Sequence, residues 1–515
     1  MFIIIAEILL ALLLLGVVLK ILFPLPSRDN IPPDQPVPAI ESPIATRTTE
    51  LASTHPGKTG LYLLPTGIDA FAMRLALADS AQQTIDARYY IWEGDLSGKM
   101  LLSAVIAAAD RGARVRLLID DNPTAGLDDM WAAANSHPNI TVRIFNPLTI
   151  RAFRPANYLF DFPRLNRRMH NKSFTVDGVA TVIGGRNVGD EYFGARSEGL
   201  FIDLDTLAIG AAVPDEQADF ERYWSSEAAY PAESILHDPE GGDLEKLKDP
   251  EYEDAVLARN YRSAAQDAIN TLASVKDGDD VEWADTRLVS DNPDKAFSKE
   301  KRSDLLAVKI APVIEGAKER FDLVSGYFVP GHNGTRFIAG LAGNGIKTRV
   351  ITNSFAVTDV PVVHAGYYPY RPPLLLAGVN LFEARPMPGQ EQEEAHNVAQ
   401  TKFSGGGESV HAKTFAIDNK ILYVGSFNFD PRSALLNCEM GLLIDSPRLA
   451  TAFNEELDKR VPEHSYQVKR TDDGKLTWTA DDNGKETVYT KEPDMNAFQR
   501  TYIAVLSKLP IEWML

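Results

Sequence analysis

The chain has 515 residues, which is too long for one ordinary hydrophobic core and predicts two or three domains. Its formal net charge is −19, and an acidic chain repels phosphate backbones, so broad nucleic-acid binding is not expected. The one cysteine, Cys438, excludes an intramolecular disulfide and a metal site built from cysteines.

The N-terminal segment differs in composition from the rest of the chain. Residues 1–23 are apolar except for Glu7 and Lys20, and about 20 such residues span a bilayer, so they predict a transmembrane anchor. A cleaved signal peptide is the alternative, although no basic leading segment and no small-residue cleavage site accompany the run. A buried soluble helix is a third interpretation. Lys20 and Arg28 follow the apolar run, so the positive-inside rule favours a cytoplasmic catalytic domain.

Two later stretches of the chain resemble one another. Residues 84–92 and 112–120 have the composition of strands and enclose an Ala-rich amphipathic run. Residues 320–328 and 345–352 repeat that arrangement. Each stretch predicts a strand, a helix, a glycine turn and a second strand. This duplication predicts an α/β protein with two pseudo-symmetric lobes, each a mixed β-sheet flanked by helices.

The predicted domain order follows from this repeat and from composition. Proline is frequent before the first repeat, and acidic and polar residues predominate between the two repeats. A further polar segment, residues 391–409, is expected to form a solvated loop. We therefore predict an anchor at 1–23, a Pro-rich tether at 24–55, lobe 1 at 56–228, an acidic helical linker at 229–280 and lobe 2 at 281–515.

Two copies of one motif carry the chemistry. His, one residue, Lys, four residues and Asp occur at His170, Lys172 and Asp177, and again at His411, Lys413 and Asp418. A chain of this length contains one such motif by chance about 0.03 times. The two copies also align further along the chain, at Gly185 and Ser426, Asn187 and Asn428, and Glu198 and Glu439.

The spacing of the motif suits a phosphodiester-transfer site. On a strand, His and Lys two positions apart project from the same face. A neutral imidazole can attack an anionic phosphodiester, and a second, protonated imidazole can protonate the leaving alcohol. Lysine and asparagine side chains can stabilise the phosphoryl oxygens. We expect both histidines to converge at the lobe interface, with Glu439 orienting His170 and Glu198 orienting His411.

Both motifs resemble those of the phospholipase D superfamily. The resemblance is greatest to the bacterial cardiolipin synthases of the C type, and it covers nearly everything from residue 55 to residue 515. The segments that carry it are Tyr89–Trp92, Leu165–Gly178, Val363–Gly366, Gly425–Ser433 and Leu509–Trp513.

This resemblance implies a phosphatidyltransferase at a bacterial inner membrane. His170 is then the expected nucleophile, forming a phosphatidyl-histidine, and His411 the expected acid and base. Phosphatidylglycerol is the implied acceptor, phosphatidylethanolamine a candidate donor and a small accessory membrane protein a candidate partner. No cofactor and no metal are expected.

The predicted substrate contacts include Tyr90, Gly185 and Ser426. Residues 151–168 contain five arginines interleaved with aromatic residues just before the first motif. This pattern favours a membrane-facing flap, with Arg167 and Arg168 as lipid contacts. A solvated loop that packs its aromatic side chains inward is the alternative.

Two other functions fit parts of the sequence. A phosphodiesterase that hydrolyses phospholipid, or less readily nucleic acid, would use the same two motifs. A catalytically silent lipid-binding protein is a third hypothesis, and the two intact motifs argue against it.

Overall fold

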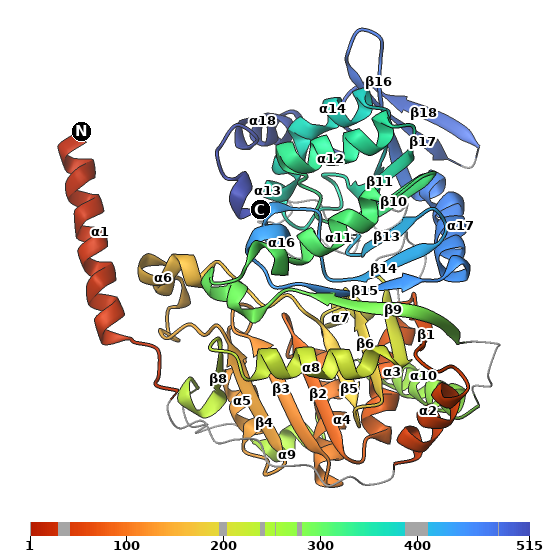
Figure 1. Cartoon of the computed structure of the whole chain (residues 1–515). Coiled ribbons are helices and arrows are strands. Elements are labelled where there is room, and N and C mark those ends of the chain that lie inside the picture. The colour runs from red at the N-terminus through yellow and green to blue at the C-terminus, as the bar shows by residue number, and fades with distance from the viewer. Residues whose placement is uncertain are drawn as a thin grey trace.

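Two α/β lobes stack on one another and share one continuous mixed sheet (Figure 1). A computed structural model describes residues 2–28, 42–194, 203–236, 243–252, 254–274, 281–386, 410–482 and 484–515.

Lobe 1 contains the first eight strands. Their order across the sheet is β8-β4-β3-β2-β5-β6-β7-β1, with β2, β3 and β4 parallel and the other pairings antiparallel. The strands are β1 (Thr59–Leu64), β2 (Thr84–Tyr89), β3 (Arg114–Asp120), β4 (Ile140–Phe145), β5 (Ser173–Val176), β6 (Ala180–Gly184), β7 (Asp205–Gly210) and β8 (Ala229–Pro231).

Lobe 2 repeats this order and adds two strands at its outer edge. Its order is β9-β15-β14-β13-β10-β11-β12-β16-β17-β18, and β9 pairs with β1 to join the lobes. The strands are β9 (Glu282–Ser290), β10 (Arg320–Ser325), β11 (Lys347–Asn353), β12 (Asn380–Ala384), β13 (Lys413–Ile417), β14 (Ile421–Gly425), β15 (Met440–Asp445), β16 (Ser465–Arg470), β17 (Leu476–Asp482) and β18 (Lys485–Tyr489).

The helices cover the sheets, and side-chain caps begin several of them. Thr66 accepts a hydrogen bond from the Asp69 N–H at the start of α3, and Asp95 accepts one from the Gly98 N–H at the start of α4. The α-helices are α1 (Phe2–Leu22), α2 (Pro43–Ser53), α3 (Gly67–Ser80), α4 (Leu96–Asp110), α5 (Asp128–Asn135), α6 (Tyr158–Leu165), α7 (Asp190–Phe193), α8 (Ala212–Trp224), α9 (Leu244–Lys248), α10 (Ala255–Ser274), α11 (Leu306–Glu315), α12 (Gly331–Gly343), α13 (Pro361–Tyr367), α14 (Arg371–Leu376), α16 (Pro431–Leu435), α17 (Pro447–His464) and α18 (Ala497–Leu506). Short 3₁₀ helices lie at Arg154–Asn157, Ala232–Ser234, Pro293–Phe297, Arg302–Asp304, Tyr368–Tyr370 and Glu512–Met514.

Both predicted strand–helix–strand units are present. β2, α4 and β3 form the first, and β10, α12 and β11 form the second, each with parallel strands. Each lobe has its own hydrophobic core. A third apolar cluster contains Ile183 and Ala208 of lobe 1 together with Val424 and Leu442 of lobe 2. The lobes are therefore packed against each other by apolar burial as well as by the β1–β9 pairing.

The N-terminal apolar segment forms a helix. Residues 2–22 form α1, which lies beside α6, and the backbone of Gly16 approaches that of Leu159 closely. Within the described part of the chain, no helix has both the length and the apolar character needed to cross a membrane. The transmembrane helix predicted for residues 1–23 is therefore not supported.

Two predicted connecting segments contain packed structure. Residues 43–53, inside the expected tether, form α2, which packs near β7. Within the range 229–280, β8 extends the first sheet, α9 lies against α4 and α10 lies against α3. The described parts of this range therefore belong to the packing of lobe 1. Residues 391–409 lie outside the described residues.

Candidate active site

The two motifs meet where the lobes touch. His170 and Lys172 lead into β5, while His411 leads into β13. The backbone N–H of His170 donates to the carbonyl of Cys438 at 2.8 Å, and the Cys438 N–H donates to the carbonyl of Arg168 at 2.8 Å. These two bonds hold the first motif directly against the second lobe.

His170 contacts a carboxylate of the opposite lobe. Its Nδ1 lies 2.8 Å from Oε2 of Glu439, the contact expected from the sequence. The hydroxyl of Ser426 donates to the same carboxylate oxygen at 2.5 Å. Burial raises the pKa of Glu439 to about 7. Burial, followed by the charges of Lys172 and Lys413, lowers the pKa of His170 well below its usual value, so this imidazole is held neutral.

His411 contacts a different carboxylate from the one expected. Its Nδ1 lies 2.6 Å from Oδ2 of Asp203 in lobe 1. The prediction assigned this position to Glu198, which lies outside the described residues. Burial lowers the pKa of His411, whereas the Asp203 charge opposes that shift. The pKa of Asp203 is itself lowered, mainly by the charge of His411 acting against the effect of burial.

The strand register explains the error. Asp205 pairs with Gly184 at the end of β6, and Gly441 pairs with Gly425 at the end of β14. In each lobe the carboxylate lies two residues before the residue that pairs with this glycine, Asp203 before Asp205 and Glu439 before Gly441. Asp203 follows Gly184 by 19 positions in lobe 1, whereas Glu439 follows Gly425 by 14 positions in lobe 2. Counting equal offsets from the histidines therefore misses Asp203 by five positions, whereas aligning the following strands would have found it.

Four charged or titratable side chains of the two motifs influence one another. The charges of His411 and of both lysines lower the pKa of His170, and the charge of Lys172 lowers that of His411. Electrostatic effects of this kind act at short range in a buried site. The two motifs therefore form one site rather than two.

The lysines place buried cations beside the imidazoles. Lys172 Nζ donates to the carbonyl of His170 at 2.7 Å, and Lys413 Nζ donates to that of His411. Burial lowers the pKa of both lysines. An anionic phosphate would offset this cost of burying two cations.

The side chains of Asn187 and Asn428 are buried. Asn187 Oδ1 accepts a hydrogen bond from the Ile91 N–H at 3.2 Å. Its buried Nδ2 has no hydrogen-bond partner among the described residues, and neither has the buried Oδ1 of Asn428. Buried polar groups normally have partners, so unpaired atoms on two motif residues fit a site that takes a polar ligand.

An aromatic ring stands edge-on to each imidazole. The ring centroid of Tyr90 lies 5.2 Å from that of His170, and Lys172 Nζ lies 5.6 Å from the Tyr90 ring. Tyr192 of α7 occupies the matching place, 5.3 Å from His411. Sequence analysis predicted Tyr90 and missed Tyr192, which lies in the sequence between the first motif and Asp203 without any motif of its own.

The motif aspartates lie away from the histidines. Asp177 accepts hydrogen bonds from the backbone N–H groups of residues 82–84. Asp418 accepts them from the N–H groups of residues 318–320. Each aspartate therefore fixes the start of the neighbouring antiparallel strand, β2 or β10, and lies at the opposite end of the motif strand from its histidine. These contacts show a structural role for both aspartates, and their catalytic role stays a prediction.

Gly185 and Ser426 occupy equivalent positions in the two lobes, and each lies next to a carboxylate that contacts a histidine. A Cβ on Gly185 would lie 2.2 Å from Oδ1 of Asp203, so glycine leaves room for that carboxylate. In the other lobe the Ser426 hydroxyl contacts Glu439. Both were predicted to contact substrate; the structure shows them beside Asp203 and Glu439, and substrate contact stays a prediction.

The arginines of residues 151–168 have partners within the chain. Arg168 is buried and pairs with Asp120 at 2.6 Å, and Arg167 donates to the carbonyls of Lys295 and Leu435. Arg151 and Arg154 pair with acidic residues of the same lobe. The guanidinium groups of Arg167 and Arg168 therefore have partners inside the protein, and lipid binding by these two residues stays a prediction.

No cluster of three or more His, Cys, Asp or Glu side chains suited to a metal ion occurs within the described ranges. The positive charge near the histidines comes from the two lysines.

Comparison with known proteins gives consistent results. The family described as "Cardiolipin synthase, PLD-like domain" matches residues 75–224 and 310–461. The chain is 44% identical over 477 residues to cardiolipin synthase C of Escherichia coli, covering 92% of this chain and 99% of that protein. It is 25% identical to a cardiolipin synthase of Oceanobacillus iheyensis, covering 78% and 69%. The crystal structure of a phosphatidylserine synthase from Haemophilus influenzae shares the fold, with a TM-score of 0.55, 14% identity and coverage of 91% and 100%.

Proposed function

We propose, from the premise that this chain belongs to the family of cardiolipin synthases with phospholipase D-like domains, that it is a phosphatidyltransferase acting on phosphatidylglycerol. One observation carries the proposal. Each imidazole is held through Nδ1 by a carboxylate of the opposite lobe, His170 by Glu439 and His411 by Asp203. In each ring Nε2 is then the nitrogen for the chemistry, as in other imidazoles oriented by carboxylates.

The electrostatics favour His170 as the nucleophile. Its pKa is held well below the usual value, and its carboxylate partner Glu439 has a pKa of about 7. His411 faces Asp203, whose low pKa keeps it ionised and helps His411 to hold a proton. A neutral nucleophile and a protonated acid are the states that the first step requires.

The reaction then proceeds in two displacements. His170 Nε2 attacks the phosphorus of the donor, the bond to the headgroup oxygen breaks, and His411 protonates the departing alcohol. The acceptor hydroxyl of phosphatidylglycerol next gives its proton to His411 and attacks the phosphatidyl-histidine, which restores His170. Lys172, Lys413 and the two asparagines stabilise the phosphoryl oxygens throughout.

The surface beside the site supports delivery of lipid from a membrane. Phe153, Leu159 and Phe162, in and next to α6, are 65%, 51% and 36% exposed. Tyr158 of α6 donates to Asn122 at 2.6 Å, and Asn122 donates to the Tyr90 hydroxyl at 3.2 Å. The apolar surface is thus linked to the ring beside His170 through two hydrogen bonds. We propose that α6 contacts the surface of a bacterial membrane through these aromatic and aliphatic side chains.

Product analysis tests the proposed function. The full chain is incubated with vesicles of phosphatidylglycerol and labelled phosphatidylethanolamine, the proposed donor. Labelled cardiolipin is the expected product, and labelled phosphatidic acid alone would identify a hydrolase. A parallel reaction with added bacterial membranes tests the need for an accessory membrane protein. A double variant without either histidine controls for contaminating activity.

A further inference from the structure

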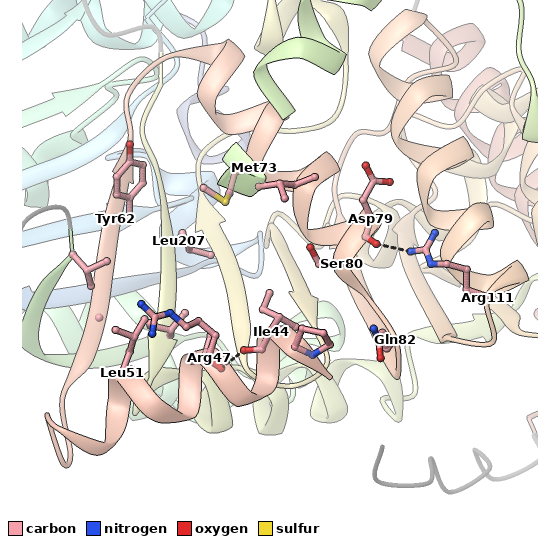
Figure 2. A pocket seen from close by; sticks show the side chains of 16 residues that line it. Ile44, Arg47, Leu51, Tyr62, Met73, Asp79, Ser80, Gln82, Arg111 and Leu207 are labelled. Atoms are coloured by element: carbon pink, nitrogen blue, oxygen red, sulfur yellow. Dashed lines mark hydrogen bonds between the residues drawn. The ribbon is translucent and has the colours of Figure 1, made fainter. Parts of the chain in front are cut away.

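A cavity in lobe 1 lies at the opposite end of β5 from His170. Its volume is about 820 Å³, and the buried side chains of Leu51 and Met73 contribute to an apolar wall (Figure 2). Gln82 lines the cavity and donates its backbone N–H to Asp177 at the far end of the motif strand. Residues that recognise the alcohol part of a substrate therefore have to lie elsewhere, beside the two histidines.

The segment that follows β10 lies directly against the second motif. Gly326 donates its N–H to the carbonyl of Ala412 at 3.3 Å. A Cβ on this glycine would lie 2.0 Å from the carbonyl oxygen of Val410 and 3.3 Å from Cα of His411, so only glycine allows this close approach. The backbone of Tyr327, the next residue, is therefore held beside His411.

The Tyr327 side chain positions a carboxylate. Its hydroxyl donates to Oδ2 of Asp359 at 2.6 Å, and Asp359 belongs to the connection between β11 and α13. Burial and then the charge of Asp359 raise the pKa of Tyr327 well above its usual value, so the hydroxyl keeps its proton. Asp359 is exposed, and its Oδ1 accepts no hydrogen bond from any residue that the structure describes. One carboxylate oxygen is thus fixed by tyrosine, and the other can accept a bond from a ligand.

The charge of Asp359 acts on groups beside His411. Burial lowers the pKa of Lys413, and the charge of Asp359 is among those that oppose this shift. Burial raises the pKa of Tyr192, whose ring centroid lies 5.3 Å from that of His411, and the charge of Asp359 adds to that effect. Coulomb interactions weaken with distance, so Asp359 lies close to the second motif.

The position of Tyr327 has a different residue in lobe 1. Trp92 and Phe328 form equivalent parallel bridges in the two lobes, so the residues that precede them, Ile91 and Tyr327, correspond. Isoleucine has no polar side-chain group with which to hold a carboxylate. The tyrosine and its carboxylate therefore distinguish the His411 side of the site, where the alcohol departs and enters in the proposed reaction.

We propose that Asp359, positioned by Tyr327, binds the alcohol part of the substrate beside His411. The matching ligand is an alcohol that carries a second hydrogen-bond donor on the neighbouring carbon. The glycerol of phosphatidylglycerol has a hydroxyl there, and ethanolamine has an ammonium group, and each can donate to Asp359 Oδ1. This inference rests on the proposed function, in which His411 serves both the leaving and the attacking alcohol.

Competition between two acceptor lipids tests the hydroxyl. The full chain is incubated with a nitrophenyl phosphodiester of a lipid as donor and with equal amounts of phosphatidylglycerol and phosphatidylpropanediol, which lacks the middle hydroxyl. Both acceptors compete for the same phosphatidyl-enzyme, so the product ratio, measured by mass spectrometry, does not depend on the donor step or on the amount of folded protein. The wild type should favour phosphatidylglycerol by about tenfold, and Asp359→Ala should bring the ratio close to one.

Competition between two donor lipids tests the ammonium group. Phosphatidylethanolamine and phosphatidylethanol, which lacks the ammonium, are supplied together with phosphatidylglycerol as the acceptor. The wild type should consume phosphatidylethanolamine about tenfold faster, and Asp359→Asn should lose this preference, because an amide carries no charge. A preference in one competition only, lost in the Asp359→Ala protein, supports the proposal and identifies which headgroup the carboxylate binds.

A second variant and a matched control complete the test. Tyr327→Phe removes the hydrogen bond that positions Asp359 and should lower each preference by about two- to fivefold. Asp472 is an exposed carboxylate between β16 and β17 of the same lobe, and Asp472→Ala should keep the wild-type ratios. Preferences that are absent from the wild type, or unchanged in both Asp359→Ala and Tyr327→Phe, would overturn the proposal. Phosphatidic acid as the only product would contradict the transfer reaction itself, and the alcohol site with it.

Discussion

The two histidines occupy the same place in two copies of one fold, yet their surroundings differ. His170 faces Glu439, a carboxylate with a pKa of about 7 that also receives the Ser426 hydroxyl. His411 faces Asp203, whose pKa is lowered. The duplicated fold supplies the symmetric positions, and we propose that the choice of carboxylate sets which imidazole holds a proton.

Removing the carboxylate charges should separate the two halves of the site most clearly. Asp203→Asn should lower turnover by about 10²- to 10⁴-fold. The substitution removes the carboxylate that fixes the tautomer of His411 and the negative charge that helps this histidine to hold a proton. Since that charge raises the pKa of His411, its loss should move the basic limb of the pH–rate profile to lower pH.

Glu439→Gln provides the matched comparison. Its effect should be smaller, about 10- to 100-fold, because Glu439 is already partly protonated near neutral pH. The basic limb should stay in place. Equal losses of turnover in the two variants, with the same shift of the basic limb, would contradict the claim that Asp203 and Glu439 act differently on their histidines. Both profiles are measured with the labelled-lipid assay.

The lysines should contribute more equally. Lys172→Met and Lys413→Met each remove one cation beside the phosphoryl oxygens and should lower turnover by about 10²- to 10³-fold. Circular dichroism provides the control for folding, because each substitution also removes a buried charge. A variant that kept wild-type turnover would show that its lysine lies outside the reaction.

Substitutions of Ser426 and Gly185, the residues next to the two carboxylates, should have unequal effects. Ser426→Gly removes one hydrogen bond to Glu439 and should lower turnover by about tenfold or less. Gly185→Ser should be far more harmful, because its Cβ would lie 2.2 Å from Asp203 Oδ1. Steady-state rates of the two proteins make the comparison, and an active Gly185→Ser enzyme would mean that Asp203 can move without cost.

The motif aspartates should affect stability more than chemistry. Asp177→Asn and Asp418→Asn weaken carboxylate bonds to three backbone N–H groups and should lower the free energy of unfolding by about 1–3 kcal/mol. The pKa of Asp418 is lowered in the folded protein, so its contribution is present above the unfolded pKa of about 3.9 and is lost as pH falls through the folded value. Denaturant unfolding at pH 7 and at lower pH measures this, and a large loss of turnover at unchanged stability would restore a catalytic role.

Sequence patterns with a fixed period were sufficient for much of the fold and part of the site. The repeated strand–helix–strand units and the spacing of the two motifs predicted both lobes and brought His170 and His411 into one site. The same spacing identified Glu439, which lies at the end of the shorter of the two connections, 14 positions after Gly425. It missed Asp203, since the connection before β7 is five residues longer than its counterpart.

Features that depend on partners distant in sequence were beyond such patterns. The basic stretch at residues 151–168 was interpreted as lipid-binding, but its arginines pair with Asp120, Asp121 and Asp128, which the sequence places far away. The motif aspartates recur in the sequence as regularly as the histidines. Each motif forms an extended strand, however, so its aspartate lies at the opposite end of that strand from its histidine.

The assignment of His170 as nucleophile and His411 as acid is tested most directly by trapping the covalent adduct. Each His→Ala variant is incubated with a nitrophenyl phosphodiester of a lipid, whose departure needs little protonation, and the intact protein is analysed by mass spectrometry. The account predicts an adduct on His170 in the His411→Ala protein and none in the His170→Ala protein. An adduct on His411 in the His170→Ala protein, with none in the reverse case, would contradict it.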